Sequence, residues 1–369
     1  MGIPEKIKAI QDEMSRTQIN KATEHHIGLL KAKIAKLRRE QEDDQTKKSS
    51  AKSDGFDVRR AGDATVVFIG MPSVGKSTLL NRLTGANSAV GAFQFTTLTV
   101  VPGMMEYKGA RIQILDLPGI IKGASGGKGL GKRILSVARS ADLVLLVLDV
   151  FQPYHEDVLI NELGNMGIRL NQDPPNIVIE KTSTGGIAVA QQKRLTKTSE
   201  AFLRDILHLY GYTSARVVIR EDVGSEQLVD YISGNKTYAR ALTVVNKIDL
   251  VDASALEGLA KGLGPGAIRV SADSNENMDM LKERIYQELA FIRIYMRPKG
   301  GPTDYEEPLI MRKNATVGAV CDKLHRRMRG DFRYALVWGS SVKFGGQRVG
   351  ISHTLYDEDV LTIVKARGS

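Results

Sequence analysis

Two segments of this chain carry residue types that can hold a nucleotide. The first fits the pattern G-x-x-x-x-G-K-[ST] and reads Gly70, Met71, Pro72, Ser73, Val74, Gly75, Lys76, Ser77. In such a loop, backbone N–H groups and the lysine surround the phosphates. The second is Asn246-Lys247-Ile248-Asp249, whose final carboxylate can accept two N–H groups from guanine but finds no such pair on adenine. Because each charge-assisted bond contributes about 1.5–3 kcal/mol, the two segments together predict a GTP-binding protein.

The elements around the first segment support this interpretation. Ala64 to Ile69 is a β-branched and aromatic run typical of a buried parallel strand, and Thr78 begins a predicted helix. Glycines in the turn and the helix N-terminus favour a bound anion. We expect Lys76 to reach the β- and γ-phosphates and Ser77 to bind Mg²⁺. The alternative, a chance glycine-rich turn, is disfavoured by the full pattern between a strand and a helix.

Residues further along the chain complete the predicted phosphate and metal site. Asp116 follows a predicted strand and can hold a water molecule on Mg²⁺, and the N–H group of Gly119 can contact the γ-phosphate. Thr97 is expected to join the Mg²⁺ shell only when GTP is bound, with Thr96 as the alternative. Lys76, Thr97 and Gly119 are therefore the predicted catalytic residues.

The order of the remaining strands indicates the fold. Predicted strands at 142–149 and 241–245 extend the sheet, and a fifth, from Ile268, ends in Ser271 and Ala272, a small polar turn suited to backing guanine. Together with the phosphate loop, this order predicts an α/β fold: a P-loop GTPase with a doubly wound, mostly parallel sheet.

One position argues against fast catalysis. Ras-like switches place a glutamine after the glycine that corresponds to Gly119, and this glutamine orients the attacking water. Here the position is Ile120, followed by Ile121, and neither side chain can hydrogen-bond water. We expect slow intrinsic hydrolysis, on the order of 10⁻⁴–10⁻³ s⁻¹ as in unassisted Ras, which a partner or a monovalent cation would raise.

Several segments are similar to a known family. Phe95 to Leu98 and the glycine-rich stretch from Asp116 to Gly131 are similar to the signature of Obg-related GTPases. Segments 20–24, 29–33 and 334–339 resemble the DRG branch (developmentally regulated GTP-binding proteins) of that group. The resemblance covers essentially the whole chain.

The resemblance implies a cytoplasmic, multidomain GTPase linked to ribosomes and translation. Its implied ligands are GTP, GDP and Mg²⁺, and its implied partners are the ribosome, RNA and a stabilising or activating protein; neither a membrane nor DNA is expected. Potassium-activated members of the wider superfamily carry an asparagine where this chain has Ser73. A serine hydroxyl could still ligate K⁺, which leaves this ion as a candidate cofactor. The related ATP-specific branch has a glutamate in place of Asp249.

Composition limits the class of protein. The chain has 369 residues, of which 42% are hydrophobic and 25% charged, typical of a soluble protein of two to four domains. No apolar run reaches the roughly 18 residues of a membrane span, and the start lacks the apolar core of a signal peptide. Cys321 is the only cysteine, so an internal disulfide is excluded and a reducing cytosol fits.

The chain is basic, with 52 Lys and Arg against 42 Asp and Glu and a formal net charge of +10. Such an excess favours polyanions, and RNA is the obvious candidate inside a cell. The alternative is a solvated basic surface without a partner.

Residues 1–54 are predicted to form a helical hairpin and a linker. Apolar residues at helical spacing define two stripes, one from Ile7 to Met14 and one from Ile27 to Leu37. The second helix is expected to turn a basic face outward, towards RNA or solvent, comprising Lys31, Lys33, Lys36, Arg38 and Arg39. The polar stretch from Glu42 to Asp54 is interpreted as the linker.

The GTPase domain is predicted at 55–170 and 235–292, interrupted by an inserted α+β domain at 171–234. In the insert, strands near 176–180 and 187–190 flank a Gly-Gly turn and predict a hairpin, followed by a helix at 199–210 and a strand at 215–219. Its basic residues could contact RNA or only solvent: Lys193, Arg194, Lys197 and Arg204.

Residues 293–369 are predicted to be a separate domain. An apolar helical stripe from Met280 to Ile292 precedes it. A strand, a helix at 317–328 and two further strands fit a β-grasp arrangement, which the resemblance identifies as a TGS domain, a module associated with RNA handling. The domain has 14 basic and 8 acidic residues. Its basic cluster comprises His325, Arg326, Arg327, Arg329 and Arg333, and Trp338 is expected in the core rather than as a base-stacking platform.

Three function classes follow. The leading one is a slow GTP-hydrolysing switch that acts on the ribosome. The second is a GTP-dependent scaffold for RNA or protein with negligible turnover, which Ile120 favours. The third, an ATPase or nucleotide kinase on the same loop, is disfavoured by Asp249.

Overall fold

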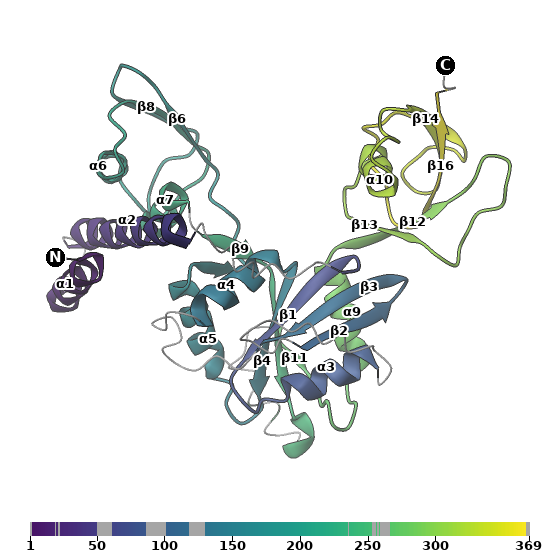
Figure 1. Cartoon of the computed structure of the whole chain (residues 1–369), viewed down its shortest axis with the longest axis horizontal. Helices are drawn as coiled ribbons and strands as arrows, with labels where there is room; N and C mark the ends of the chain where they lie inside the picture. Colours follow the sequence, from purple (N-terminus) through teal and green to yellow (C-terminus); the bar gives the residue numbers. More distant parts are fainter. Residues whose placement is uncertain are drawn as a thin grey trace. The chain divides into compact units, whose positions relative to one another are not determined.

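The computed structural model describes residues 2–18, 20, 23–49, 61–85, 101–117, 130–234, 236–252, 256, 258 and 266–366. The chain divides into two compact units (Figure 1). The first unit combines Met1–Gly55 with Gly167–Tyr238, and the second combines Phe56–Met166 with Ala239–Ser369. The chain therefore leaves the first unit, returns to it once and leaves it again.

A six-stranded sheet forms the centre of the second unit, in the order β11-β10-β4-β1-β3-β2. Neighbouring strands are parallel except β2, which is antiparallel to β3. This confirms the predicted mostly parallel sheet, whose inner strands are apolar on both faces because both faces are covered. The strands are β1 Ala64–Gly70, β2 Val101–Tyr107, β3 Ala110–Asp116, β4 Leu143–Asp149, β10 Ala241–Asn246 and β11 Ile268–Arg269.

Strand β2 was not predicted from the sequence. Its second and third residues are Pro102 and Gly103, which weaken any strand pattern. An edge position tolerates a proline because one side of the strand needs no backbone donor. The position of β2 at the edge of the sheet therefore explains why its sequence carries so little strand signal.

Helices cover both faces of this sheet. Helix α3 (Lys76–Thr84) and α9 (Met278–Glu288) pack into one core cluster, to which Leu79, Leu281 and Ile285 belong. Figure 1 shows α4 (Leu130–Ser140) and α5 (His155–Asn165) on the other side of the strands. Because β1, β3, β4 and β10 run parallel, their carboxyl ends lie at the same end of the sheet. The nucleotide motifs lie at this end.

The helix predicted to continue to Ile292 is shorter than expected. Helix α9 ends at Glu288, and Ala290 adopts a positive φ of 50°. Strand β12 (Phe291–Met296) begins immediately afterwards, so Ile292 belongs to a strand. The alternating sequence Phe-Ile-Arg-Ile-Tyr-Met favours a strand, whereas its apolar residues happen to continue the helical spacing.

The carboxyl-terminal part of the second unit is a five-stranded sheet in the order β13-β12-β16-β14-β15. Helix α10 (Val317–Leu324) contributes Val317, Val320 and Cys321 to a core cluster with the strands. Only the β12–β16 pair is parallel. This arrangement confirms the predicted β-grasp fold. The other strands are β13 Leu309–Arg312, β14 Phe332–Trp338, β15 Gln347–Val349 and β16 Asp359–Lys365.

Two details of this sheet differ from expectation. Helix α10 ends at Leu324, four residues before Met328, where the helix had been expected to end. Trp338 is only half-buried and lies outside the core cluster, because it alternates to the sheet face opposite α10. The guanidinium of Arg297 stacks over its ring at 4.9 Å from the centroid. Trp338 is thus covered by Arg297 rather than by the core.

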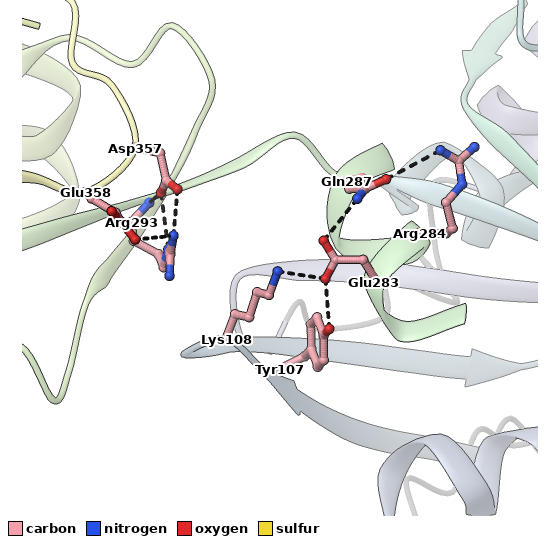
Figure 2. A network of polar contacts seen from close by, with 8 residues as sticks. All are labelled: Tyr107, Lys108, Glu283, Arg284, Gln287, Arg293, Asp357 and Glu358. Atoms are coloured by element: carbon pink, nitrogen blue, oxygen red, sulfur yellow. Dashed lines mark hydrogen bonds and ion pairs between the residues drawn. The ribbon is translucent and has the colours of Figure 1, made fainter. Parts of the chain in front are cut away.

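Within each part of the second unit, a network of ion pairs and hydrogen bonds joins neighbouring elements (Figure 2). In the β-grasp sheet, Arg293 of β12 contacts Asp357 at 2.7 Å and Glu358 at 2.8 Å, in the turn before β16. In the GTPase part, Glu283 of α9 accepts hydrogen bonds from Tyr107 at 2.8 Å and from Lys108 at 2.7 Å. The second network fastens α9 to the end of edge strand β2.

The first unit contains the helical hairpin and the insert. Helices α1 (Ile3–Arg16) and α2 (Glu24–Ser49) form the predicted hairpin. Helix α2 continues through 42–49, where a linker was expected, because the Glu, Gln and Lys residues there are good helix formers despite their polarity. None of the helices among the described residues combines the length and apolarity needed to cross a membrane.

The insert is a three-stranded sheet with two helices, but the predicted hairpin does not form. Strand β8 lies between the other two, antiparallel to β6 and parallel to β7. Its Ala215, Val217 and Ile219 are buried, so the most apolar of the three strands takes the centre. The insert consists of β6 Ile177–Lys181, β7 Ile187–Gln191, α6 Glu200–Leu209, β8 Ala215–Ile219 and α7 Ser225–Ser233. The flanking strands β5 Ile168–Leu170 and β9 Thr237–Ala239 pair with each other.

Helix α2 packs against the insert. Much of its basic face, which was expected to point outward, makes this contact. Lys31 pairs with Glu226, and Lys36 donates to the carbonyl of Leu209 at 2.9 Å. Arg39 likewise donates to the carbonyl of Ser233 at 3.0 Å. Three of the five basic residues assigned to an outward face therefore hold α2 on α6 and α7.

Candidate functional site

Residues 70–77 form a tight loop between β1 and α3. Gly75 has a positive φ of 90°. A Cβ atom on Gly75 would lie 2.3 Å from Nδ2 of Asn246, and one on Gly70 would lie 2.4 Å from the carbonyl oxygen of Val147. Close packing therefore requires glycine at both positions, and the backbone conformation requires it again at Gly75.

The other loop residues differ in burial. Val74 is buried and Met71 packs against the core of the sheet, so both anchor the loop. Thr78 is half-buried in the first turn of α3. Pro72 and Ser73 are exposed, and Ser73 adopts a positive φ of 64°. The loop is thus anchored by its two apolar residues, while Pro72 and Ser73 are exposed to solvent.

The ammonium group of Lys76 lies inside the loop. Its Nζ donates to the carbonyl oxygens of Gly70 at 3.2 Å and Met71 at 2.9 Å. Burial lowers the pKa of Lys76 and outweighs the opposing influence of the Asp116 charge. Because the present partners are neutral carbonyl groups, phosphate oxygens would give this cation stronger, charged partners.

Asp116 and Ser77 meet at the end of β3. The Ser77 hydroxyl donates to Oδ2 of Asp116 at 2.7 Å. The other carboxylate oxygen, Oδ1, is buried and has no hydrogen-bond partner within the described residues. Burial raises the pKa of Asp116, although the bond from Ser77 and the charge of Lys76 oppose the rise. An unpartnered buried carboxylate oxygen beside a serine hydroxyl is a donor set that suits Mg²⁺ and its bound water.

Asn246 joins the phosphate loop to the turn that follows β11. Its Nδ2 donates to the carbonyl of Val74 at 3.0 Å, and its Oδ1 accepts the N–H of Ala272 at 3.0 Å. The side chain is buried at the end of β10. One amide thus fixes the spacing between the two segments that the sequence assigned to phosphates and to base.

Lys247 and Asp249 follow in a turn. Nζ of Lys247 donates to the carbonyl of Ser73 at 2.8 Å and pairs with Asp149 at 2.7 Å. Asp249 lies in the short helix η2 (Ile248–Leu250) with an exposed side chain. No described residue hydrogen-bonds its carboxylate, which leaves both oxygens available to a base.

Ser271 shapes the turn that follows β11. It is fully buried, and its hydroxyl accepts the N–H of Ser274 at 3.1 Å. This bond shapes the turn that presents the backbone of Ala272. The predicted contact of Ser271 and Ala272 with the base stays a prediction.

Two polar residues near the site were missed from the sequence. Asp149, the partner of Lys247, ends β4 in register with Asn246, and this position at the end of a parallel strand could have identified it. Arg82 of α3 donates to the carbonyl oxygens of Ala272 and Asp273. No sequence pattern marks Arg82, because its role depends on a contact across the fold.

Four predicted residues lie outside the described residues: Thr96, Thr97, Gly119 and Ile120. Their roles stay predictions. The described site therefore consists of the phosphate loop, Asp116 and the base segment from Asn246 to Asp249 with the turn at Ala272.

Protein-family models match three consecutive regions. Residues 65–181 match a model described as a 50S ribosome-binding GTPase. Residues 184–291 match one described as the C-terminal region of the MMR_HSR1 domain. Residues 292–365 match the TGS domain.

Relatives match along the full length. The chain is 52% identical over 370 residues to GTP-binding protein MJ1326 of Methanocaldococcus jannaschii, covering 100% of this chain and 94% of that protein. It is 46% identical to the developmentally-regulated GTP-binding protein 2 homolog of Dictyostelium discoideum, covering 99% of this chain and 100% of that protein. It is 45% identical to developmentally-regulated GTP-binding protein 2 of Homo sapiens, with the same coverage.

Proposed function

This chain belongs to the DRG family of GTP-binding proteins, and we propose that it is a slow GTP-hydrolysing switch that acts on the ribosome. The observation that carries the proposal is the meeting of Lys76, Ser77 and Asp116 beside a base segment tied to the same loop by Asn246. Lys76 would hold the β- and γ-phosphates, and Asp249 would accept two N–H groups of guanine.

Mg²⁺ is the proposed cofactor. Ser77 would bind it directly and Asp116 through water, exchanging their mutual hydrogen bond for the metal shell. When bound, Mg²⁺ neutralises charge that develops on the β- and γ-phosphate oxygens. Thr97 would complete the shell in the GTP state, and the N–H of Gly119 would contact the γ-phosphate.

The proposed hydrolysis is slow because the residue after Gly119 is Ile120, which cannot orient water. Lys76, Thr97 and Gly119 would stabilise charge on the γ-phosphate without activating the nucleophile. A partner protein, the ribosome or K⁺ near Ser73 would supply the missing assistance. The same residue favours a second candidate, a GTP-dependent scaffold for RNA or protein with negligible turnover.

The ribosome and RNA are the proposed partners, and the cytoplasm the proposed compartment. One support is the description of the model matched by residues 65–181, a 50S ribosome-binding GTPase. The other is the net charge of +10. Within the insert, Arg204 contacts Glu200 and the carbonyl of Ile187. The exposed Lys193, Arg194 and Lys197 are therefore better placed to meet phosphate.

Single-turnover GTP hydrolysis tests this function. Purified full-length protein is measured in potassium and in sodium buffer, with and without ribosomes of its source. Strong stimulation by ribosomes supports a switch that acts on them, and stimulation by K⁺ alone assigns the assistance to the cation. Tight GTP binding without stimulation by either favours the scaffold. Intrinsic turnover faster than about 1 s⁻¹ contradicts the role given to Ile120.

A further inference from the structure

Arg82 links the helix of the phosphate loop to the turn beside the base. It lies in the last turn of α3, seven residues beyond Gly75. Its Nε donates to the carbonyl oxygen of Ala272 at 2.8 Å, and its Nη2 donates to that of Asp273 at 3.0 Å. One guanidinium edge thus holds two successive carbonyl groups of the turn.

These bonds close a ring through the site. Val74 accepts a hydrogen bond from Asn246, and Asn246 accepts one from the N–H of Ala272. The carbonyl of Ala272 then accepts from Arg82, which α3 connects covalently back to Val74. The N–H group of Ala272 is therefore held by Asn246, which also binds the phosphate loop. Its carbonyl group is held by Arg82, which belongs to the helix that follows this loop.

The chemistry of the side chain suits this position. Two neighbouring carbonyl groups require two donors at fixed spacing, which the planar guanidinium provides and a lysine ammonium does not. The bonds also fix the direction of the two carbonyl groups of Ala272 and Asp273. These hydrogen bonds therefore hold the backbone of the turn at a fixed distance from the phosphate loop.

We propose that Arg82 is a positioning residue for guanine recognition, which fixes the turn at Ala272 relative to the phosphate loop. The inference rests on the proposed binding of GTP by this site. It predicts that Arg82 contributes to the binding of the guanine base and does not change the affinity for the phosphates. A purely structural role at the end of α3 would instead change stability, or affect all ligands of the loop equally.

The test compares Arg82→Ala and Arg82→Lys in the full-length protein with the control Asn81→Ala, an exposed neighbour on the same helix. Dissociation constants are measured for GTP, for ATP and for inorganic triphosphate, together with the thermal unfolding temperature. We expect both Arg82 variants to weaken GTP binding roughly three- to tenfold and to speed GDP release. Triphosphate affinity should stay unchanged, so the preference for GTP over ATP should fall.

The outcomes separate the inference from the function on which it rests. Unchanged GTP affinity in both folded variants overturns the role of Arg82, as does an equal loss of GTP and triphosphate affinity. Failure of the unsubstituted protein to bind GTP overturns the proposed function itself. If Arg82→Ala unfolds, Arg82→Lys still decides the question, because it keeps the charge and the stem but removes the two-carbonyl contact.

Discussion

The hydroxyl of Ser77, in the first turn of α3, and the carboxylate of Asp116, at the end of β3, are hydrogen-bonded to each other over 2.7 Å, although they lie 39 residues apart in the chain. Both are the residues proposed to share one magnesium ion. Their mutual bond occupies one oxygen of Asp116 and leaves the other buried without a partner among the described residues. Two groups that are proposed to bind one cation thus hold each other in place.

Replacing Asp116 should separate metal binding from stability. Burial raises the pKa of Asp116, so the folded protein holds its proton more tightly than the unfolded chain does. The stability of nucleotide-free protein should therefore rise as pH falls through the raised pKa towards 3.8. Asp116→Asn should remove this pH dependence, stabilise the nucleotide-free protein at pH 7 and abolish the effect of Mg²⁺ on GDP release. Thermal unfolding in EDTA and GDP release with and without Mg²⁺ measure the two effects; lower stability at pH 7 would contradict the burial argument.

Lys76→Ala should abolish measurable GTP binding. The ammonium would make charge-assisted bonds of about 1.5–3 kcal/mol each to the β- and γ-phosphates, which predicts a loss of roughly a hundredfold or more. Because burial lowers the pKa of Lys76, its removal should not destabilise the fold. Titration calorimetry with GTP checks the loss, and Lys313→Ala, at an exposed lysine in the turn after β13, is the control. Unchanged binding would remove Lys76 from the site.

Asp249→Asn should change the base that the site prefers. The carboxylate can only accept hydrogen bonds, whereas an amide presents a donor that suits the carbonyl group of xanthine at the same position. GTP affinity should fall and XTP affinity should rise, with phosphate contacts intact. Competition among GTP, XTP and ATP measures this change. If ATP competes equally with GTP in the unsubstituted protein, the guanine assignment itself is wrong.

Asp230→Ala should destabilise the first unit. The carboxylate of Asp230 binds Arg169 through two bonds, at 2.6 and 3.0 Å, and only 8% of its side chain is exposed. Removing it deprives the largely buried Arg169 guanidinium of this carboxylate, which costs about 2–4 kcal/mol after allowance for the partial exposure of the arginine. Chemical denaturation provides the measurement. The double variant Asp230→Ala with Arg169→Met should recover part of the loss.

Glu283 should make the free energy of unfolding fall as the pH falls into the acid range. Hydrogen bonds from Lys108, Tyr107 and Gln287 lower its pKa from 4.5 to about 2 (Figure 2). A depressed pKa in the folded state contributes stability that is present above pH 4.5 and disappears as pH falls through about 2. Glu283→Gln should therefore cost about 0.5–1 kcal/mol at pH 7, since the partners are half-exposed, and the difference should shrink below pH 4.5. Urea unfolding at several pH values decides this; a difference that is constant down to pH 3 would contradict it.

The sequence was sufficient where a function depends on a contiguous pattern. Lys76 and Ser77 stand inside one eight-residue motif, and Asp116 and Asn246 end strands that are rich in β-branched and aliphatic residues. A parallel sheet brings strand ends together, so these residues could be grouped from the sequence alone.

The sequence was insufficient where a function or pairing depends on contacts that local preference does not encode. Arg82 reaches a turn 190 residues away. Strand β7 pairs in parallel with β8 rather than with β6, although the Gly-Gly turn favoured a hairpin locally. Lys31 and Lys36 have the appearance of solvent-facing charges, and only the position of α6 and α7 shows that they bind the insert. In each case contact with an element distant in the chain determined the outcome.

The packing of α2 on the insert has a consequence for biosynthesis. His25 contacts Asp205, 180 residues later in the chain, and a Cβ atom on Gly28 would lie only 2.6 Å from the Phe202 ring. Synthesis proceeds from the N-terminus, so α2 emerges long before the surface that covers it exists. Its apolar residues stay uncovered while the strands of the second unit are being translated. The surface that covers this face of α2 is therefore complete only once α7 has been made, up to Ser233.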